Sequence, residues 1–312
     1  MRSYADTHCD TVVKLYCDGQ RLRKNAKQID LERLSVYGTG IQVFALWLQP
    51  WYYEKAFART MQYLRFYQAE LAANQDKICP AFTYADIEKN KQNNKISAIL
   101  SLEGGEAIES DLERISFFYE QGVRMLSLTW NHGNALADGV LAPQKGGLTP
   151  LGKRAVQNME KMGMILDVSH LSDAGFYEVA HLMQKPFIAS HSNARAICDH
   201  PRNLTDAQLQ IMREIGGYVG LNFYPPFVAQ KESVGTEDLL RQLLYLLDKA
   251  GEDAVGFGTD FDGIDKMPYD MRGVEDMTIF LERLEKELGP TLLQKVCEEN
   301  FLRVTKKIWK DT

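Results

Sequence analysis

Short apolar runs alternate with amphipathic stretches along almost the whole chain. Each run is rich in Val, Ile, Leu and Phe and has the length of one buried strand. The eight runs cover residues 3–10, 40–48, 95–104, 123–130, 163–170, 186–192, 217–224 and 254–263. The stretches between them have the apolar spacing of helices that pack on one face. The pattern therefore predicts eight units, each a strand followed by a helix.

Eight such units predict a parallel sheet that closes into a (β/α)8 barrel of the TIM type, regular or distorted. The competing fold is a doubly wound open sheet, which usually carries a glycine-rich phosphate loop after its first strand. Here the first strand runs into DTHCDTVVK, which contains no glycine. No low-complexity linker interrupts the chain, so we expect residues 1–312 to form a single barrel domain.

The longest irregular segment, residues 131–149, follows the fourth predicted strand. It reads NHGNALADGVLAPQKGGLT and has no hydrophobic periodicity. Loops of this length in compact domains are usually functional or disordered. At this position we expect the segment to form one wall of an active site.

Composition narrows the class of protein. The chain is 45% hydrophobic and 25% charged, which is typical of a soluble globular protein. Its net charge of -6 argues against nucleic acid or an anionic membrane as a partner, because both require a concentrated basic face. No apolar run approaches the ~20 residues that span a bilayer, and the first strand leaves no space for a signal peptide. We therefore expect a cytoplasmic protein, with its five cysteines reduced.

Side chains that can bind metal ions stand at the carboxyl ends of the predicted strands. They are His8, Asp10, Glu103, His170, His191 and Asp260. In a (β/α)8 barrel these strand ends meet on one face, where the active sites of this fold lie. Three of the six histidines follow apolar runs in this way, which chance placement explains poorly.

The spacing of these residues predicts two metal sites. His8 and Asp10 are two positions apart on a strand, so they point to the same side and can bind one ion. His170 and His191 end consecutive strands about 4.8 Å apart and can bind a second ion, while the two oxygens of Glu103 can bridge both. Histidine and carboxylate ligands without thiolate suit Zn2+, with Mn2+, Co2+ and Fe2+ as alternatives. Two such ions hold a bridging hydroxide and polarise a carbonyl, as in hydrolases.

The remaining strand-end residues have more than one interpretation. Asp260 is free to take a proton from the bridging water and pass it to a leaving group. Asp262 has the same strand parity, so it stays open as the proton carrier or as a residue that orients the site. Trp130 and Tyr224 fit either core packing or pocket lining, and His132 in the long loop could face the site or the solvent.

Eight short motifs are spread along nearly the whole chain. They are DTHCDT at 6–11, SLEGGEAI at 101–108, LTWNHGN at 128–134, LDVSHLS at 166–172, SHSNARAICDHPRN at 190–203, GLNFY at 220–224, GFGTDFDG at 256–263 and NFLRV at 300–304. SHSNAR followed by PRN, and GTDFDG, are the most specific. Together the motifs resemble the membrane (renal) dipeptidases and their bacterial homologues, within the metal-dependent amidohydrolase superfamily.

The resemblance implies roles for individual residues. It implies the same metal ligands, with His8 and Asp10 on one zinc, Glu103 bridging, and His170 and His191 on the second zinc. Asp260 matches the aspartate that transfers the proton. Arg202, in PRN, matches an arginine that holds the carboxylate of the dipeptide, a role that suits a planar bidentate donor. Tyr224, in NFY, matches a residue of the pocket.

One position departs from the family pattern. Family members such as the renal enzyme have a histidine directly after the Leu-Thr of the fourth strand, where it helps to stabilise the tetrahedral intermediate; this chain has Trp130. His132, two residues further on, could take over this role, or Asn131 or another loop donor could do so. The departure concerns oxyanion stabilisation and side-chain specificity, and it leaves the metal ligands intact.

The sequence as a whole predicts a two-zinc dipeptidase. A metal-bridging hydroxide attacks the peptide carbonyl of a dipeptide, and Asp260 moves the proton to the departing amine. The resemblance implies that L-Xaa-D-Xaa dipeptides are substrates, and it is compatible with a homodimer. The alternatives are an amidohydrolase acting on a small N-acyl amino acid, an inactive metal-binding barrel, and a barrel glycosidase that uses Glu103 and Asp260 as its two carboxylates. The glycosidase leaves the three strand-end histidines unexplained.

Overall fold

A closed parallel barrel forms the centre of the molecule. The computed structural model describes residues 3–38, 40–144 and 146–310. In these ranges the strands are β1 (Ala5–Cys9), β2 (Ile41–Trp47), β3 (Ile78–Pro80), β4 (Ile96–Glu103), β5 (Val123–Ser127), β6 (Ile165–Asp167), β7 (Ile188–Ala189), β8 (Tyr218–Leu221) and β9 (Val255–Phe257). All pairings between them are parallel, and the pairing of β2 with β4 closes a ring of eight strands in the order β1, β2, β4, β5, β6, β7, β8, β9. The predicted (β/α)8 barrel is confirmed.

Each of the eight predicted apolar runs contains one strand of the barrel, but most of the strands are shorter than the runs. β6 and β7 stop before the histidines that follow them, so these residues lie on short loops above the strands. The ninth strand, β3, was not predicted. It is only three residues long and pairs with one half of β4, which is too short for a periodic pattern to reveal.

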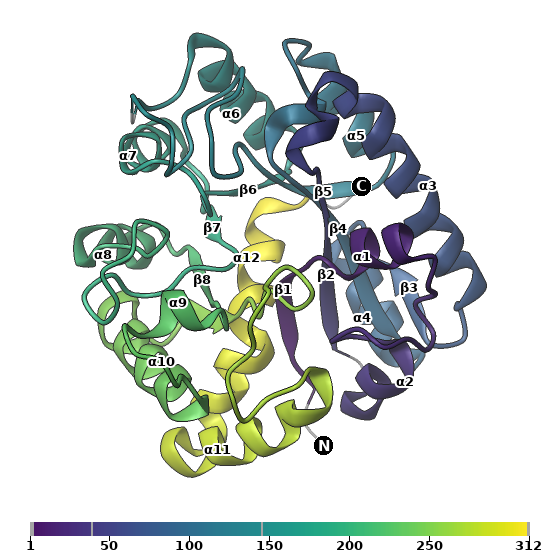
Figure 1. Ribbon diagram of the computed structural model, residues 1–312, viewed down its shortest axis with the longest axis vertical. Coiled ribbons are helices and arrows are strands. Elements are labelled where there is room, and N and C mark those ends of the chain that lie inside the picture. The colour runs from purple at the N-terminus through teal and green to yellow at the C-terminus, as the bar shows by residue number, and fades with distance from the viewer. Residues whose placement is uncertain (1–2, 39, 145, 311–312) are drawn as a thin grey trace.

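Helices surround the barrel (Figure 1). They are α1 (Thr11–Asp18), α2 (Leu31–Leu34), α3 (Ala56–Ala73), α4 (Tyr84–Gln92), α5 (Glu113–Glu120), α6 (Pro150–Met162), α7 (Asp173–Leu182), α8 (Asp206–Glu214), α9 (Pro225–Val228), α10 (Thr236–Ala250), α11 (Met277–Gln294) and α12 (Asn300–Ile308). Local sequence explains where α6 begins. Thr149 accepts a hydrogen bond from the backbone of Gly152 at 3.0 Å, and Pro150 is the first residue of the helix. Within the described ranges, no helix combines the length and apolar composition that crossing a membrane requires.

The last helix closes one end of the barrel. Phe301, Val304 and Ile308 of α12 pack in one buried cluster with inward residues of the strands, among them Ala5 and Ile188. Figure 1 shows α12 behind the ring of strands, at its centre. Because the amino ends of the strands are filled in this way, the carboxyl ends remain as the face where a pocket can open.

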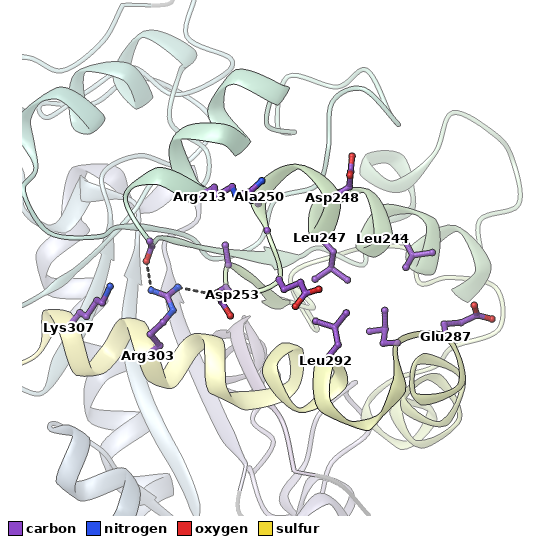
Figure 2. A pocket seen from close by; sticks show the side chains of 15 residues that line it. Arg213, Leu244, Leu247, Asp248, Ala250, Asp253, Glu287, Leu292, Arg303 and Lys307 are labelled. Carbon is purple, nitrogen blue, oxygen red and sulfur yellow. Dashed lines mark hydrogen bonds between the residues drawn. The ribbon is translucent and has the colours of Figure 1, made fainter.

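Arg303 of α12 holds two loops at the closed end. Its Nη1 donates to the carbonyl of Gly216 at 2.6 Å, and its Nη2 donates to the carbonyls of Gly217 and Asp253, both at 2.8 Å. Arg303, Gly216 and Asp253 line a surface groove between α10, α11 and α12, which Figure 2 shows with Lys307 beside Arg303. The guanidinium therefore joins the segments that lead into β8 and β9.

Replacing Arg303 with methionine is expected to lower the free energy of unfolding by about 2–4 kcal/mol, because three backbone carbonyls lose a charged donor. Urea denaturation followed by circular dichroism measures the change. The matched control is Lys307→Met, one helical turn away and exposed, for which we expect less than about 0.5 kcal/mol. Equal shifts for the two variants would contradict a stabilising role for Arg303.

Candidate active site and metal centre

A pocket of about 310 Å3 opens at the carboxyl ends of the strands. The predicted site residues that line it are Asp10, Glu103, Trp130, Asn131, His170, Tyr224 and Asp260. His8 and His191 lie next to these residues and are each only 1% exposed. The eight-stranded ring therefore brings together side chains that are up to 252 positions apart in the sequence, from His8 to Asp260.

The first group of candidate ligands surrounds His8. Its Nε2 lies 3.4 Å from Oδ2 of Asp10, 3.5 Å from Oε2 of Glu103 and 3.8 Å from Oδ1 of Asp260. The ligand atoms of His8, Asp10 and Asp260 all lie within 4.8 Å of one another, a spacing at which one cation can contact all three.

The second group lies on the other oxygen of Glu103. Oε1 is 2.9 Å from Nε2 of His170 and 3.6 Å from Nε2 of His191. The two histidine nitrogens are 2.9 Å apart. Glu103 thus presents one carboxylate oxygen to each group, as a bridging ligand must.

Hydrogen bonds behind the two histidines fix their orientation. Nδ1 of His170 lies 2.8 Å from Oδ1 of Asn131, an amide oxygen that can only accept. Nδ1 of His191 lies 2.7 Å from Oγ of Ser190, whose proton goes to the carboxylate of Asp167 at 2.5 Å. Both Nδ1 atoms are therefore donors, and both Nε2 atoms carry lone pairs toward Glu103.

The chemistry of these donor groups fits a bound cation. The two Nε2 lone pairs and an ionised oxygen of Glu103 point at the same small space, where they repel one another unless a positive charge lies between them. Neither ring nitrogen of His8, nor Oδ1 of Asp10, has a hydrogen-bond partner within the described ranges, although all three are buried. Buried polar atoms without partners are rare and costly, and metal ligation satisfies them.

Burial and neighbouring charges shift the pKa values across the site. Burial and the nearby carboxylates raise the pKa of Asp10 to about 6 and that of Asp260 to about 7. Burial by itself would lower the pKa of His8, but Glu103 and Asp10 outweigh it and raise the value well above the usual range. For His170, burial and the charge of Arg202 lower the pKa to about 4, which keeps the ring neutral and able to act as a ligand.

Asp260 is held in an unusual backbone conformation. Its φ of 63° is left-handed, and His170 has a φ of 68°; both are uncommon for residues other than glycine and cost free energy that surrounding contacts must supply. The backbone N–H of Asp260 donates to the carbonyl of His8 at 3.1 Å, and Asn222 donates to Oδ2 of Asp260 at 3.0 Å. These contacts leave Oδ1 directed toward His8.

The carboxylate of Asp262 binds other groups. It accepts from Oγ1 of Thr11 at 2.6 Å and from the backbone of Gln28 at 2.8 Å. Asp262 therefore anchors the start of α1 and the segment after it, and Asp260 is the member of the pair that lines the pocket. The alternation of side chains along a strand could not decide which of the two aspartates faces the site. In the structure neither residue lies on a regular strand.

Arg202 is 4% exposed and is not among the residues that line the pocket, but it contacts the backbone of His191. Its Nη2 donates to the carbonyl of His191 at 3.3 Å, while its Nε is buried without a partner in the described part of the chain. Burial lowers the pKa of Arg202 to about 10 despite the nearby carboxylates of Asp260 and Glu103. A buried guanidinium with an unused donor next to the site is suited to hold an anionic group of a ligand.

The candidate residues near position 130, where the sequence departs from the family pattern, differ in their exposure. Trp130 is half-buried and lines the pocket, as do Asn131 and Tyr224. Burial and the neighbouring Asp265 raise the pKa of Tyr224 to about 12. His132 is exposed and is not among the residues that line the pocket, so Asn131 is the loop residue beside the metal-binding side chains.

Several residues that contribute to the site were not predicted. Asp167 and Ser190 orient His191, and Asn222 orients Asp260. Gly263 is also required, because a Cβ there would clash with the carboxylates of both Asp10 and Asp260. The signal for the first two was present, since Asp167 and Ser190 stand inside the LDVSH and SHS motifs, directly beside the predicted ligands.

Comparisons with known proteins identify the family of the chain. A family model described as membrane dipeptidase, peptidase family M19, matches residues 2–311. The dipeptidase AclJ of Aspergillus oryzae is 30% identical over 294 residues, which make up 89% of this chain and 69% of that protein.

Solved structures superpose over nearly the full length. A metallopeptidase from Rhodobacter sphaeroides, liganded with a phosphinate mimic of the dipeptide L-Ala-D-Ala, matches with a TM-score of 0.91 and 27% identity over 99% of each chain. The dipeptidase AC, a metallopeptidase of family M19, matches with a TM-score of 0.92 and 28% identity, again over 99% of each chain. The chain therefore belongs to the membrane dipeptidase family, peptidase family M19, and is a metal-dependent dipeptidase.

Proposed function

We propose that this chain hydrolyses the peptide bond of dipeptides, L-Xaa-D-Xaa among them, at a centre of two Zn2+ ions held by His8, Asp10, Glu103, His170 and His191. One observation carries the proposal: the two oxygens of Glu103 face two separate groups of buried ligand atoms. A carboxylate in that position fits a bridging ligand, which single-metal chemistry does not require. The same five residues accept Mn2+, Co2+ or Fe2+ according to supply.

The metal ions, when bound, supply Lewis-acid activation of a water molecule and of the scissile carbonyl. Asp260 is placed to take the proton of the attacking water and deliver it to the leaving amine, because Asn222 holds one carboxylate oxygen and the other faces the ligand groups. By taking the proton of the water, the carboxylate becomes the acid that protonates the leaving amine, as long as it stays within reach of both atoms. Trp130 stands in place of the family histidine that helps to stabilise the tetrahedral intermediate. Asn131 lines the pocket and His132 does not, so we assign this role to Asn131.

Recognition of the substrate follows from Arg202. Its free Nε and its burial suit it to pair with the terminal carboxylate of a dipeptide, and a longer peptide would place an uncharged amide there instead. The phosphinate mimic of L-Ala-D-Ala bound by the Rhodobacter sphaeroides protein supports dipeptides of this stereochemistry as the substrate class. The pocket volume of about 310 Å3 also matches a ligand of dipeptide size.

An amidohydrolase that acts on small N-acyl amino acids would use the same metal ligands and the same Arg202. The two functions differ in the amino end of the substrate. A dipeptide carries a charged amine there, whereas an N-acyl amino acid carries an uncharged acyl group. The pocket carries the carboxylates of Asp10, Asp260 and Asp265, which favours a cationic group and therefore the dipeptide. Comparison of L-Ala-D-Ala with N-acetyl-D-Ala tests the difference directly.

The first experiment measures metal content together with hydrolysis. We expect two metal ions per chain, cleavage of L-Ala-D-Ala that chelation abolishes, and no cleavage of N-acetyl-D-Ala or a tripeptide. Asp260→Asn should retain both metals while kcat falls roughly 10²–10⁴-fold, because a positioned proton carrier is lost. Asp248→Asn, in the groove at the opposite end of the barrel, serves as the control and should leave kcat unchanged. One metal per chain with full activity would rule out the bridged centre.

A second prediction concerns carboxylate binding. Replacing Arg202 with methionine should lower kcat/KM for L-Ala-D-Ala by roughly 10²-fold, because the substrate carboxylate is left buried without its partner. Activity on the dipeptide amide, which lacks this charge, should fall much less. The matched control is Arg23→Met, whose guanidinium pairs with Asp76 away from the pocket. A uniform loss on the dipeptide and its amide would contradict the assignment.

A third prediction concerns the orientation of His191. Ser190→Ala removes the hydroxyl between His191 and Asp167, so we expect zinc to bind about 10- to 100-fold more weakly. Competition with a chromophoric chelator measures the affinity. Ser192→Ala is the control, since its hydroxyl is buried but has no hydrogen-bond partner among the described residues. Equal zinc affinity in the two variants would show that Ser190 does not support the ligand.

A further inference from the structure

The strand order sets two walls of the pocket against each other. In the ring of eight strands, β2 lies four places from β7, so the two are on opposite sides of the barrel. Trp47 ends β2, whereas Arg202 follows β7. Tyr224 and Phe227 line the pocket and follow β8, and the guanidinium of Arg202 lies 5.5 Å from the centre of the Phe227 ring. The metal-binding side chains, with Glu103 at their centre, lie between these walls.

The wall opposite Arg202 is aromatic. The rings of Trp47 and Trp130 lie 5.1 Å apart between centroids at an angle of 59°, so the two indoles pack into one continuous surface. Trp47 pairs in register with Glu103, and the ring of Trp130 lies 6.3 Å from that of His170. Both indoles are half-buried and line the pocket. This surface therefore borders the centre directly.

Of the three residues next to the two indoles, one is apolar and the two polar ones offer little to a buried ligand. Val13 is buried and lines the same pocket. Gln49, the nearest amide along the chain, accepts a hydrogen bond from Tyr63 at 2.5 Å and so has its oxygen engaged away from a ligand. Lys14 is exposed at the pocket and supplies charge only where solvent can screen it.

We propose that Trp47 and Trp130 form the subsite for the side chain of the amino-terminal residue of the substrate, and that this subsite selects large apolar side chains such as Leu, Met or Phe. The inference rests on the proposed function. When Arg202 holds the carboxylate and the scissile carbonyl lies at Glu103, the amino-terminal residue extends toward the opposite wall. The side chain of the carboxyl-terminal residue lies on the Arg202 side, where the indoles do not reach it.

The strength of the selection follows from the apolar area that the side chain buries. Transfer of a Leu side chain from water onto the indoles should raise kcat/KM about tenfold over Gly at the same position. Trp130 supplies half of this apolar surface and lies beside the ring of His170, where the amino-terminal side chain would meet it. Trp130 is thus a specificity-determining residue here.

The test compares two substrate series in each variant. The first series is Gly-D-Ala, L-Ala-D-Ala and L-Leu-D-Ala, and the second is L-Ala-D-Ala and L-Ala-D-Leu. In the wild type, kcat/KM should rise about tenfold from Gly to Leu at the amino side. Trp47→Ala and Trp130→Ala should reduce this ratio to about threefold or less and leave the ratio of the second series unchanged. Ratios within one variant are insensitive to a general loss of active enzyme.

Two further variants guard against trivial explanations. Trp130→Phe keeps an aromatic surface and should retain most of the preference for Leu. Trp51→Ala changes an indole that is 74% exposed and outside the pocket, so its ratios should equal those of the wild type.

Three results would overturn the inference. A wild-type enzyme that cleaves Gly-D-Ala and L-Leu-D-Ala equally well leaves the proposed function intact and refutes the subsite. A change in the carboxyl-side ratio in Trp47→Ala or Trp130→Ala would mean that the substrate lies the other way round. Absence of cleavage for every dipeptide would refute the proposed function, and the subsite with it.

Discussion

Glu103 is the carboxylate on which the rest of the site depends. It is buried at the end of β4, and each of its oxygens faces a different group of ligand atoms, with His8 on one side and His170 and His191 on the other. So many lone pairs and carboxylates cannot share a buried space without positive charge between them. The left-handed backbone conformations of His170 and Asp260 cost further free energy at the point where these side chains meet.

The barrel supplies the rigidity that this arrangement requires. Closure of the ring places five separate strand ends around one point, and α12 fills the opposite end so that the pocket opens on one face only. Support continues behind the ligands, where Asn131 holds His170 and the pair of Ser190 and Asp167 holds His191. His170 and His191 are thereby each fixed in one tautomer before any ion binds.

The surroundings of the candidate centre are asymmetric, which under the proposed function would let one centre recognise both ends of a small substrate. A buried guanidinium, Arg202, lies on the side of β7, and an apolar surface of Trp47 and Trp130 lies across from it. Charge recognition and apolar burial would therefore act on different parts of the proposed substrate. The candidate metal ligands between them are different residues from Trp47 and Trp130, so substrate preference would be able to vary while the hydrolytic chemistry is retained.

The sequence by itself determined the eight strand-helix units and the placement of His8, Glu103 and His170 near strand ends, because hydrophobic periodicity is a local property and a closed barrel collects strand ends on one face. Only the tertiary structure decided that Asp262 turns toward Thr11, that His132 lies in solvent, and that Trp47 packs on Trp130. The sequence did not reveal β3, whose three residues pair with only half of β4. These features depend on loop conformations and on contacts between distant segments, and no pattern along the chain encodes them.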